Sequence, residues 1–148
     1  MVSRFRARRR RDLGVAVTSF SFVIPLQPVA ASRAKVSRYG TYYPAKHNAY
    51  RSECIAFLKS LVVPPPWPLL KPERLTVRLD YHMRKAKTSR LSTPREDIDN
   101  LIKLTLDCIT SSERFWKDDT QVDVVLARKI FISPGEQPTT HIQIKRSQ

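Results

Sequence analysis

The acidic residues of this basic chain are concentrated in one short stretch. The chain has 148 residues and a net charge of +14, yet eight of its thirteen acidic residues lie between Glu96 and Asp123. Clustered carboxylates bind hard divalent cations, and such cations in turn accept phosphate oxygens. We therefore interpret this stretch as a candidate metal site within a surface that binds a polyanion.

The first part of the candidate site is the segment Asp97-Ile98-Asp99-Asn100-Leu101-Ile102-Lys103. We expect Asp97 directly before a helix and Asp99 at its N-cap, because Asp at that position accepts free backbone N–H groups. Lys103 follows Asp99 by one helical turn on the same face. An isolated Asp-x-Asp pair is also typical of a helix cap with a solvated neighbour, and Lys103 has the alternative of a salt bridge to Asp99 or Asp107.

The second part of the candidate site is the pair Asp118-Asp119, which precedes a predicted strand. It can bring a third carboxylate to Asp97 and Asp99. An Asp pair before a strand is by itself usually a turn. Carboxylates that converge from two elements indicate a metal site rather than scattered surface charge.

The elements that must position these residues follow from hydrophobic periodicity. Leu75, Val77, Leu79 and Tyr81 alternate with polar residues, as in a half-buried strand. We predict strands at about 16–25, 74–83, 121–133 and 141–146, helices at about 44–61 and 99–109, and loops at 27–43 and 84–94. The order β-α-β-α-β-β predicts a small single-domain α+β fold with a mixed sheet packed against helices.

The composition indicates which class of partner the protein binds and which cellular compartment it occupies. The charge of +14 favours nucleic acid, with an anionic membrane surface second, and no apolar run reaches the ~20 residues of a membrane span. Cys54 and Cys108 lack metal-site spacing, which indicates buried free thiols in a reducing compartment. We interpret residues 1–12 as a flexible basic arm. The alternative is a signal or transit peptide that is cleaved near Ser32.

Taken together, the motifs resemble the RusA family of Holliday-junction resolvases. The resemblance is carried by Asp97-x-Asp99-Asn100-Leu101-x-Lys103, then Asp107, then Asp118-Asp119-x-Gln121-Val122, and Lys129. It is specific over residues 97–129 and looser over most of the chain after the arm. The chain departs from the family pattern at Glu96 and at Ala34-Lys35-Val36-Ser37.

The resemblance implies that residues 13–148 form a homodimeric, Mg²⁺-dependent endodeoxyribonuclease domain that cuts four-way DNA junctions, with Mn²⁺ as the alternative metal. Asp97, Asp99 and Asp119 would bind the metal, with Asp118 as a further partner, and Lys103 would be the essential lysine. We expect hydrolysis of the phosphodiester by metal-activated water, with Lys103 stabilising the phosphorane. The expected compartment is the cytoplasm of a bacterial or phage-infected cell.

DNA contacts are expected from basic side chains outside the acidic stretch. These are Arg33, Lys35, Arg38, Lys46, Arg51, Arg84, Lys85, Lys87 and Arg90. Tyr39, Tyr42 and Tyr43 lie among them and either stack on exposed bases or pack their loop. His47, His82 and His141 lack ligand spacing and are expected to be structural or surface residues. Trp116 is expected in core or hinge packing rather than as a wedge between bases.

Two other functions remain open from the sequence. A non-catalytic basic nucleic-acid-binding protein would explain the charge, but it leaves the acidic cluster unexplained. A nuclease for flaps, forks or other branched DNA would use the same metal site. Cleavage of a four-way junction, compared with other branched substrates, separates the three.

Overall fold

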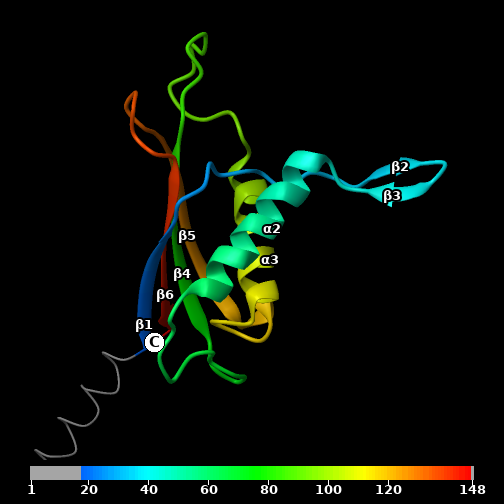
Figure 1. Ribbon diagram of the computed structural model, residues 1–148. Coiled ribbons are helices and arrows are strands. Elements are labelled where there is room, and N and C mark those ends of the chain that lie inside the picture. Colours follow the sequence, from blue (N-terminus) through cyan, green and yellow to red (C-terminus); the bar gives the residue numbers. More distant parts are fainter. Residues whose placement is uncertain (1–17, 148) are drawn as a thin grey trace, which may run out of the picture.

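The protein is built on a four-stranded mixed sheet with both helices on one of its faces (Figure 1). The computed structural model describes residues 18–147. The strands are β1 (Ser19–Ile24), β4 (Leu75–Met83), β5 (Val122–Phe131) and β6 (Thr139–Arg146), in the spatial order β1-β6-β4-β5. Strand β6 is antiparallel to β1 and β4, whereas β5 is parallel to β4.

Two helices cover the inner face of this sheet. Helix α2 (Ala45–Ser60) precedes β4, and helix α3 (Ile98–Ser112) connects β4 to β5. A parallel strand pair needs such a crossover, because the chain must return to the starting edge of the sheet. A short 3₁₀ helix, η1 (Asp119–Gln121), leads directly into β5. The predicted α+β fold, with its mixed sheet and its order of elements, is confirmed.

The core lies between the sheet and the helices. Leu75, Val77, Leu79 and Tyr81 are buried, as the alternation in β4 predicted. The hydroxyl groups of Tyr81 and Thr105 lie 2.8 Å apart and join β4 to α3. Trp116 is fully buried, which confirms its expected place in the core.

The segment 27–43 is not the plain loop that the sequence suggested. Strands β2 (Lys35–Ser37) and β3 (Gly40–Tyr42) form an antiparallel hairpin that projects away from the rest of the molecule (Figure 1). Gly40 follows the turn with φ of 123°, a conformation that favours glycine. All residues of both strands are exposed, so no buried alternation marked them in the sequence.

Other expectations have mixed outcomes. The proposed basic arm at residues 1–12 and the expected start of the first strand lie outside the described residues. Cys54 and Cys108 are buried and free, as expected. Neither helix within residues 18–147 combines the length and the apolar character that a bilayer span requires.

Candidate active site beside helix α3

A cavity of about 760 Å³ lies beside α3 and gathers residues from four parts of the chain. It contains two of the residues that the sequence assigned to catalysis, Lys103 on α3 and Asp119 on η1. Its charged and titratable lining consists of Arg33, His47, Arg51, Lys103, Asp107 and Asp119. Lysine and arginine beside two carboxylates can hold a phosphate whose charge is also met by a metal ion.

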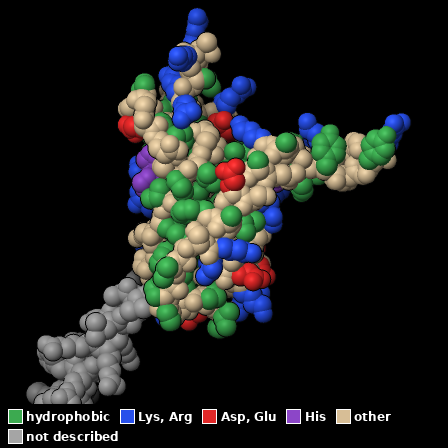
Figure 2. Space-filling view, viewed as in Figure 1, with side chains coloured by type: hydrophobic (Ala, Val, Ile, Leu, Met, Phe, Trp, Pro, Cys, Tyr) green, Lys and Arg blue, Asp and Glu red, His purple; other side chains and the backbone are tan. Residues whose placement is uncertain are grey.

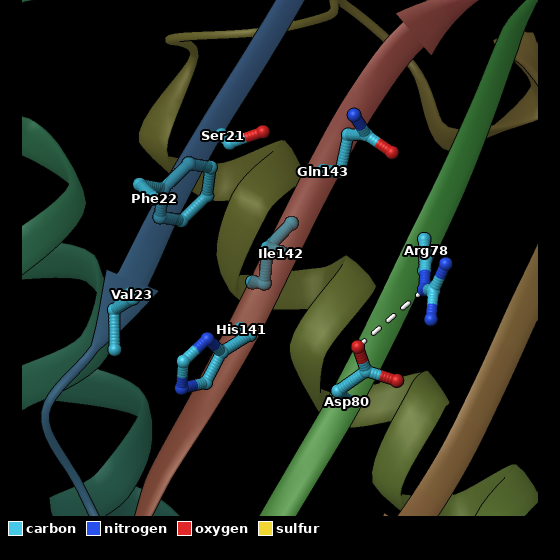
Figure 3. A pocket seen from close by; sticks show the side chains of 8 residues that line it. All are labelled: Ser21, Phe22, Val23, Arg78, Asp80, His141, Ile142 and Gln143. Atoms are coloured by element: carbon cyan, nitrogen blue, oxygen red, sulfur yellow. Dashed lines mark ion pairs between the residues drawn. The ribbon is translucent and has the colours of Figure 1, made fainter.

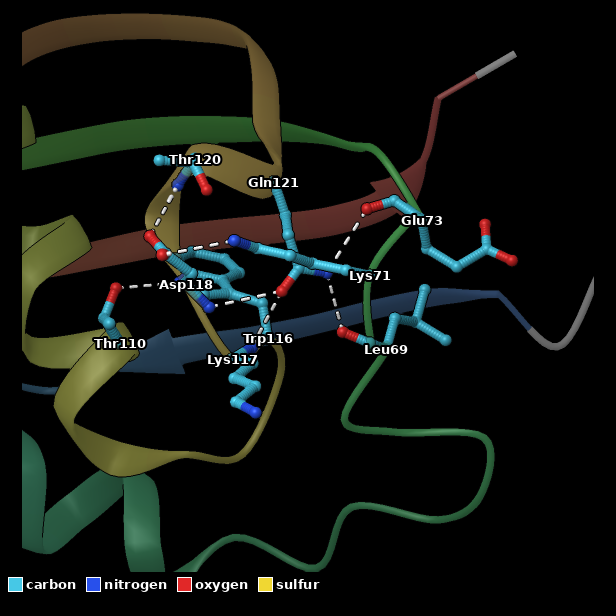
Figure 4. A network of polar contacts seen from close by, with 9 residues as sticks. All are labelled: Leu69, Lys71, Glu73, Thr110, Trp116, Lys117, Asp118, Thr120 and Gln121. Atoms are coloured by element: carbon cyan, nitrogen blue, oxygen red, sulfur yellow. Dashed lines mark hydrogen bonds and ion pairs between the residues drawn. The ribbon is translucent and has the colours of Figure 1, made fainter.

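The turn that carries Asp119 is held by Gln121, whose side chain is 2% exposed (Figure 4). Its amide nitrogen donates to the carbonyl oxygens of Leu69 at 2.8 Å and Glu73 at 3.2 Å. Its amide oxygen accepts the backbone N–H groups of Lys117 at 3.0 Å and Asp118 at 3.2 Å. A buried amide with all these partners fixes the backbone around it. Gln121 therefore positions Asp119, which lies two residues earlier in the chain.

Asp118 has a local structural role in the same turn. Its Oδ1 accepts the backbone N–H of Thr120 at 3.0 Å, and its Oδ2 lies 3.5 Å from Lys71 Nζ. The hydrogen bond from Thr120, followed by the charge of Lys71, holds the pKa of Asp118 below its ordinary value. Asp118 therefore caps η1, which gives its side chain a use other than metal binding.

Asp119 is in a different electrostatic environment. Partial burial is the main reason that its pKa is raised above the ordinary value, and the carboxylates of Asp118 and Asp107 raise it further. No Lys or Arg forms an ion pair with Asp119 in the part of the chain that the structure describes. A carboxylate that lies beside other carboxylates and has no basic partner of its own is stabilised by a bound cation.

Asp97 and Asp99 lie at the N-terminal end of α3. Asp97, not Asp99, is the N-cap residue, and its side chain makes no capping hydrogen bond. Asp99, which the sequence suggested as the N-cap residue, lies instead in the first turn of the helix. Neither carboxylate has an ion-pair partner among residues 18–147, although the chain is strongly basic. Both remain available to a cation.

The carboxylates do not form a closed metal cluster. Within residues 18–147, no three His, Cys, Asp or Glu side chains lie close enough together to hold one ion. Asp119 lines the cavity together with Asp107, and Asp107 lies roughly 12 Å from Asp99 along the helix axis at 1.5 Å per residue. The donor chemistry nevertheless fits Mg²⁺, since this ion takes oxygen ligands and commonly uses only one or two carboxylates together with phosphate oxygens and water.

Lys103 is exposed and lacks the salt bridge that was its alternative role. No carboxylate lies within ion-pair distance of it among the described residues. Asp107 pairs instead with Arg51 at 2.8 Å, and Arg51 also donates to Ser111 Oγ at 2.8 Å. Arg51, which the sequence suggested as a DNA contact, therefore bridges α2 and α3, and Lys103 keeps its charge free for a ligand.

The other predicted DNA contacts lie on two projections. Lys35, Arg38 and Tyr39 belong to the β2–β3 hairpin, with Arg33 before it and Lys46 just after it on α2. The segment that follows β4 carries the remaining four, Arg84, Lys85, Lys87 and Arg90, and all are exposed. Lys and Arg side chains stand out on both projections (Figure 2). Positive charge is therefore displayed on extensions that can reach along a DNA backbone.

Sequence reasoning missed one histidine arrangement. His82 and His141 come together on the outer face of the sheet, with ring centroids 4.6 Å apart. That face also carries the ion pair between Arg78 and Asp80 (Figure 3). The signal that could have revealed this histidine pair is the register of β4 and β6, which places Asp80 opposite His141. His47 is structural, as expected, and its contacts to the hairpin are described below.

One of the comparisons with known proteins finds a family for this chain. The family model described as endodeoxyribonuclease RusA matches residues 25–145. This match spans the hairpin, both described helices, strands β4 and β5 and nearly all of β6, and it includes Asp97, Asp99, Lys103 and Asp119. A search of the curated proteins finds no match. With nearly all of its length matched by one family model, the chain belongs to the RusA family of endodeoxyribonucleases.

Proposed function

We propose that this protein is a metal-dependent endodeoxyribonuclease that resolves four-way (Holliday) DNA junctions by paired phosphodiester hydrolysis. Membership of the RusA family supplies the reaction class. The observation that carries the proposal is the shared cavity of Lys103 and Asp119, which also contains Arg33. This arrangement places free positive charge and an unpaired carboxylate where a DNA phosphate can reach both.

Mg²⁺, with Mn²⁺ as the alternative, is the proposed metal. The candidate ligands are Asp97, Asp99 and Asp119, whose carboxylates have no Lys or Arg partner among residues 18–147. Because no three of the described acidic side chains lie close enough to share one ion, one or two of them at a time would hold it together with phosphate oxygens and water. Asp118 is a less favoured metal ligand than Asp119, since it already caps η1 and pairs with Lys71. When bound, the ion would activate a water molecule and neutralise charge on the phosphate.

The remaining roles belong to the chain itself. Lys103 would stabilise the negative charge that develops on the phosphorane, because no carboxylate among residues 18–147 forms an ion pair with its ammonium group. Arg33 would hold a neighbouring phosphate in the same cavity. The exposed basic residues of the hairpin and of the 84–90 segment would bind flanking phosphates, which gives affinity but no sequence preference.

We further propose that the active protein is a homodimer that acts in the cytoplasm. A four-way junction has approximate two-fold symmetry, so a two-fold dimer would present one site to each of two equivalent strands. Neither of the described helices covers the outer face of the sheet, which exposes apolar side chains, with Leu126 58% and Val124 41% exposed. Two free buried cysteines are compatible with a reducing compartment.

The test is a cleavage assay on a synthetic four-way junction with each strand labelled in turn. With Mg²⁺, the wild type should produce symmetric nicks, and Asp99→Asn, Asp119→Asn and Lys103→Met should lose most of this activity. Glu53→Gln is the matched control, because Glu53 is exposed on α2 away from the cavity. Binding without nicks by the wild type would favour the non-catalytic alternative. Equal cleavage of flaps and forks would favour a broader branched-DNA nuclease.

A further inference from the structure

The β2–β3 hairpin exposes an unusual amount of apolar and aromatic surface. Val36 is 83% exposed and Tyr39 is 84% exposed, while Tyr42 and Tyr43 are about half exposed. The hairpin forms a separate two-stranded sheet and extends away from the core (Figures 1 and 2). A two-stranded hairpin is only marginally stable without a surface to pack on, so this arrangement indicates a binding partner.

The charge of the hairpin indicates what kind of partner it binds. The segment from Ser32 to Lys46 contains four basic residues and no acidic residue. A second copy of the same chain, with its net charge of +14, would bring like charge toward this surface. Basic side chains interleaved with aromatic rings are instead suited to nucleic acid, whose phosphates and base faces they contact separately.

The tip of the hairpin presents two flat groups together. The guanidinium carbon of Arg38 lies 4.9 Å from the centre of the Tyr39 ring, and Arg38 Nη2 donates to the Tyr39 hydroxyl oxygen at 2.6 Å. Aromatic rings and guanidinium planes stack on nucleobases whose faces are free. In continuous duplex DNA the base faces are covered by their neighbours, whereas stacking is interrupted where strands exchange at a branch point.

The base of the hairpin is anchored by His47 on α2. The backbone N–H of Ser32, on the chain entering the hairpin, donates to His47 Nδ1 at 3.1 Å. The ring of Tyr43, on the chain leaving it, stacks on the His47 ring with centroids 4.6 Å apart. Arg33 and Tyr43 also line the cavity that contains Lys103 and Asp119. The hairpin is thus held at a fixed place beside the candidate active site.

We propose that the β2–β3 hairpin recognises the branch point, with Tyr39 and Arg38 stacking on base faces exposed there, and that it determines the preference for branched over duplex DNA. This inference rests on the proposed function, because it assumes a branched DNA substrate. Tyr39 is then a specificity-determining residue for binding and has no part in the hydrolysis.

The experiment compares binding to a four-way junction and to a duplex of the same sequence, with Ca²⁺ in place of Mg²⁺. Tyr39→Ala in the full-length protein should weaken junction binding about ten-fold or more, while duplex binding changes little. Tyr39→Phe should retain the preference of the wild type, because it keeps the ring. Lys46→Ala is the matched control, and it should weaken binding to both DNAs by a similar factor.

A second measurement locates the contact. A junction with 5-iodouracil at the branch point should crosslink to the hairpin on irradiation, and the same base placed in a duplex arm should not. The inference is overturned if Tyr39→Ala leaves the junction-to-duplex affinity ratio unchanged, or if the branch-point crosslink maps outside residues 32–46. Failure of the proposed function would be seen separately, as a wild type that prefers junctions but never nicks them with Mg²⁺.

Discussion

The ammonium group of Lys129 donates a hydrogen bond of 2.7 Å to the backbone carbonyl of Glu96, the residue before Asp97. A second bond of the same length reaches the carbonyl of Pro94. Lys129 is half-buried on the inner face of β5, in register with Tyr81 of β4. Strand β5 therefore holds the chain just before α3, and this fixes the approach of Asp97 to the helix.

Lys129→Met should impair catalysis more than binding. The substitution removes both hydrogen bonds, so the segment before Asp97 should shift, and displacements of about 1 Å near reacting groups can lower rates by ~100-fold. We expect single-turnover nicking of a junction to fall at least about ten-fold, with a smaller change in junction affinity. Lys145→Met is the control for loss of one charge, because Lys145 is exposed on β6. Equal losses of rate and affinity would contradict a positioning role.

Asp118 and Asp119 should differ sharply when each is changed to Asn. Asn is as good a cap as Asp, so Asp118→Asn should keep the bond from Thr120 and retain activity within about three-fold. Asp119→Asn should lose most activity, because it removes the proposed metal ligand. The measurement is the nicking rate as a function of Mg²⁺ concentration. A larger loss of activity for Asp118→Asn than for Asp119→Asn would mean that Asp118, and not Asp119, is the metal ligand.

The elements with a regular pattern could be predicted, and the hairpin could not. Strand β4 alternates buried and exposed side chains along its length, and α3 carries a broad apolar face, so both were found close to their observed bounds. Strands β2 and β3 have three residues each and bury none of them. Gly40 was the one local signal, and a single glycine does not distinguish a hairpin from a loop.

Two of the predicted site residues, Lys103 and Asp119, share one cavity, but the geometry that brings them together could not be predicted from the sequence. The sequence indicated that Asp119 would approach α3, and it does so beside Lys103 and Asp107. Which turn of α3 it faces depends on Gln121, whose partners Leu69 and Glu73 are distant in sequence. Such long-range hydrogen bonds leave no periodic trace in the sequence.

Gln121→Leu should lower the stability of the fold. Leucine matches the side chain in size, but it leaves the carbonyls of Leu69 and Glu73 and two backbone N–H groups without their partner. Unsatisfied buried groups cost about 1–3 kcal/mol each, so we expect a loss of at least about 2 kcal/mol in the free energy of unfolding from urea titrations. Gln143→Leu, on the exposed face of β6, should change it much less. A similar small change at both positions would show that the Gln121 network contributes little.

His47 should make stability depend on pH below neutrality. Burial lowers its pKa from 6.5, an effect that nearby Arg51 adds to and Asp107 opposes. The unfolded chain therefore binds more protons than the folded one as pH falls below 6.5. The contribution of His47 to the stability of the fold is present above that pH, and it is lost as pH falls through the lowered pKa of the folded state. Protonation also removes the acceptor for the Ser32 N–H. The free energy of unfolding should fall less steeply with pH in His47→Gln, and identical slopes would contradict this.

The basic segment after β4 should contribute to affinity through phosphate contacts alone. Arg84 and Arg90 are exposed, and no ion pair engages them among residues 18–147. Each phosphate contact changes the slope of log affinity against log salt by about 0.9. Arg84→Ala and Arg90→Ala should therefore each flatten this slope by up to that amount for junction and duplex alike. Arg74→Ala should not flatten it, because Arg74 lies 3.8 Å from Asp123. If all three variants gave the slope of the wild type, the 84–90 segment would not lie along the DNA backbone.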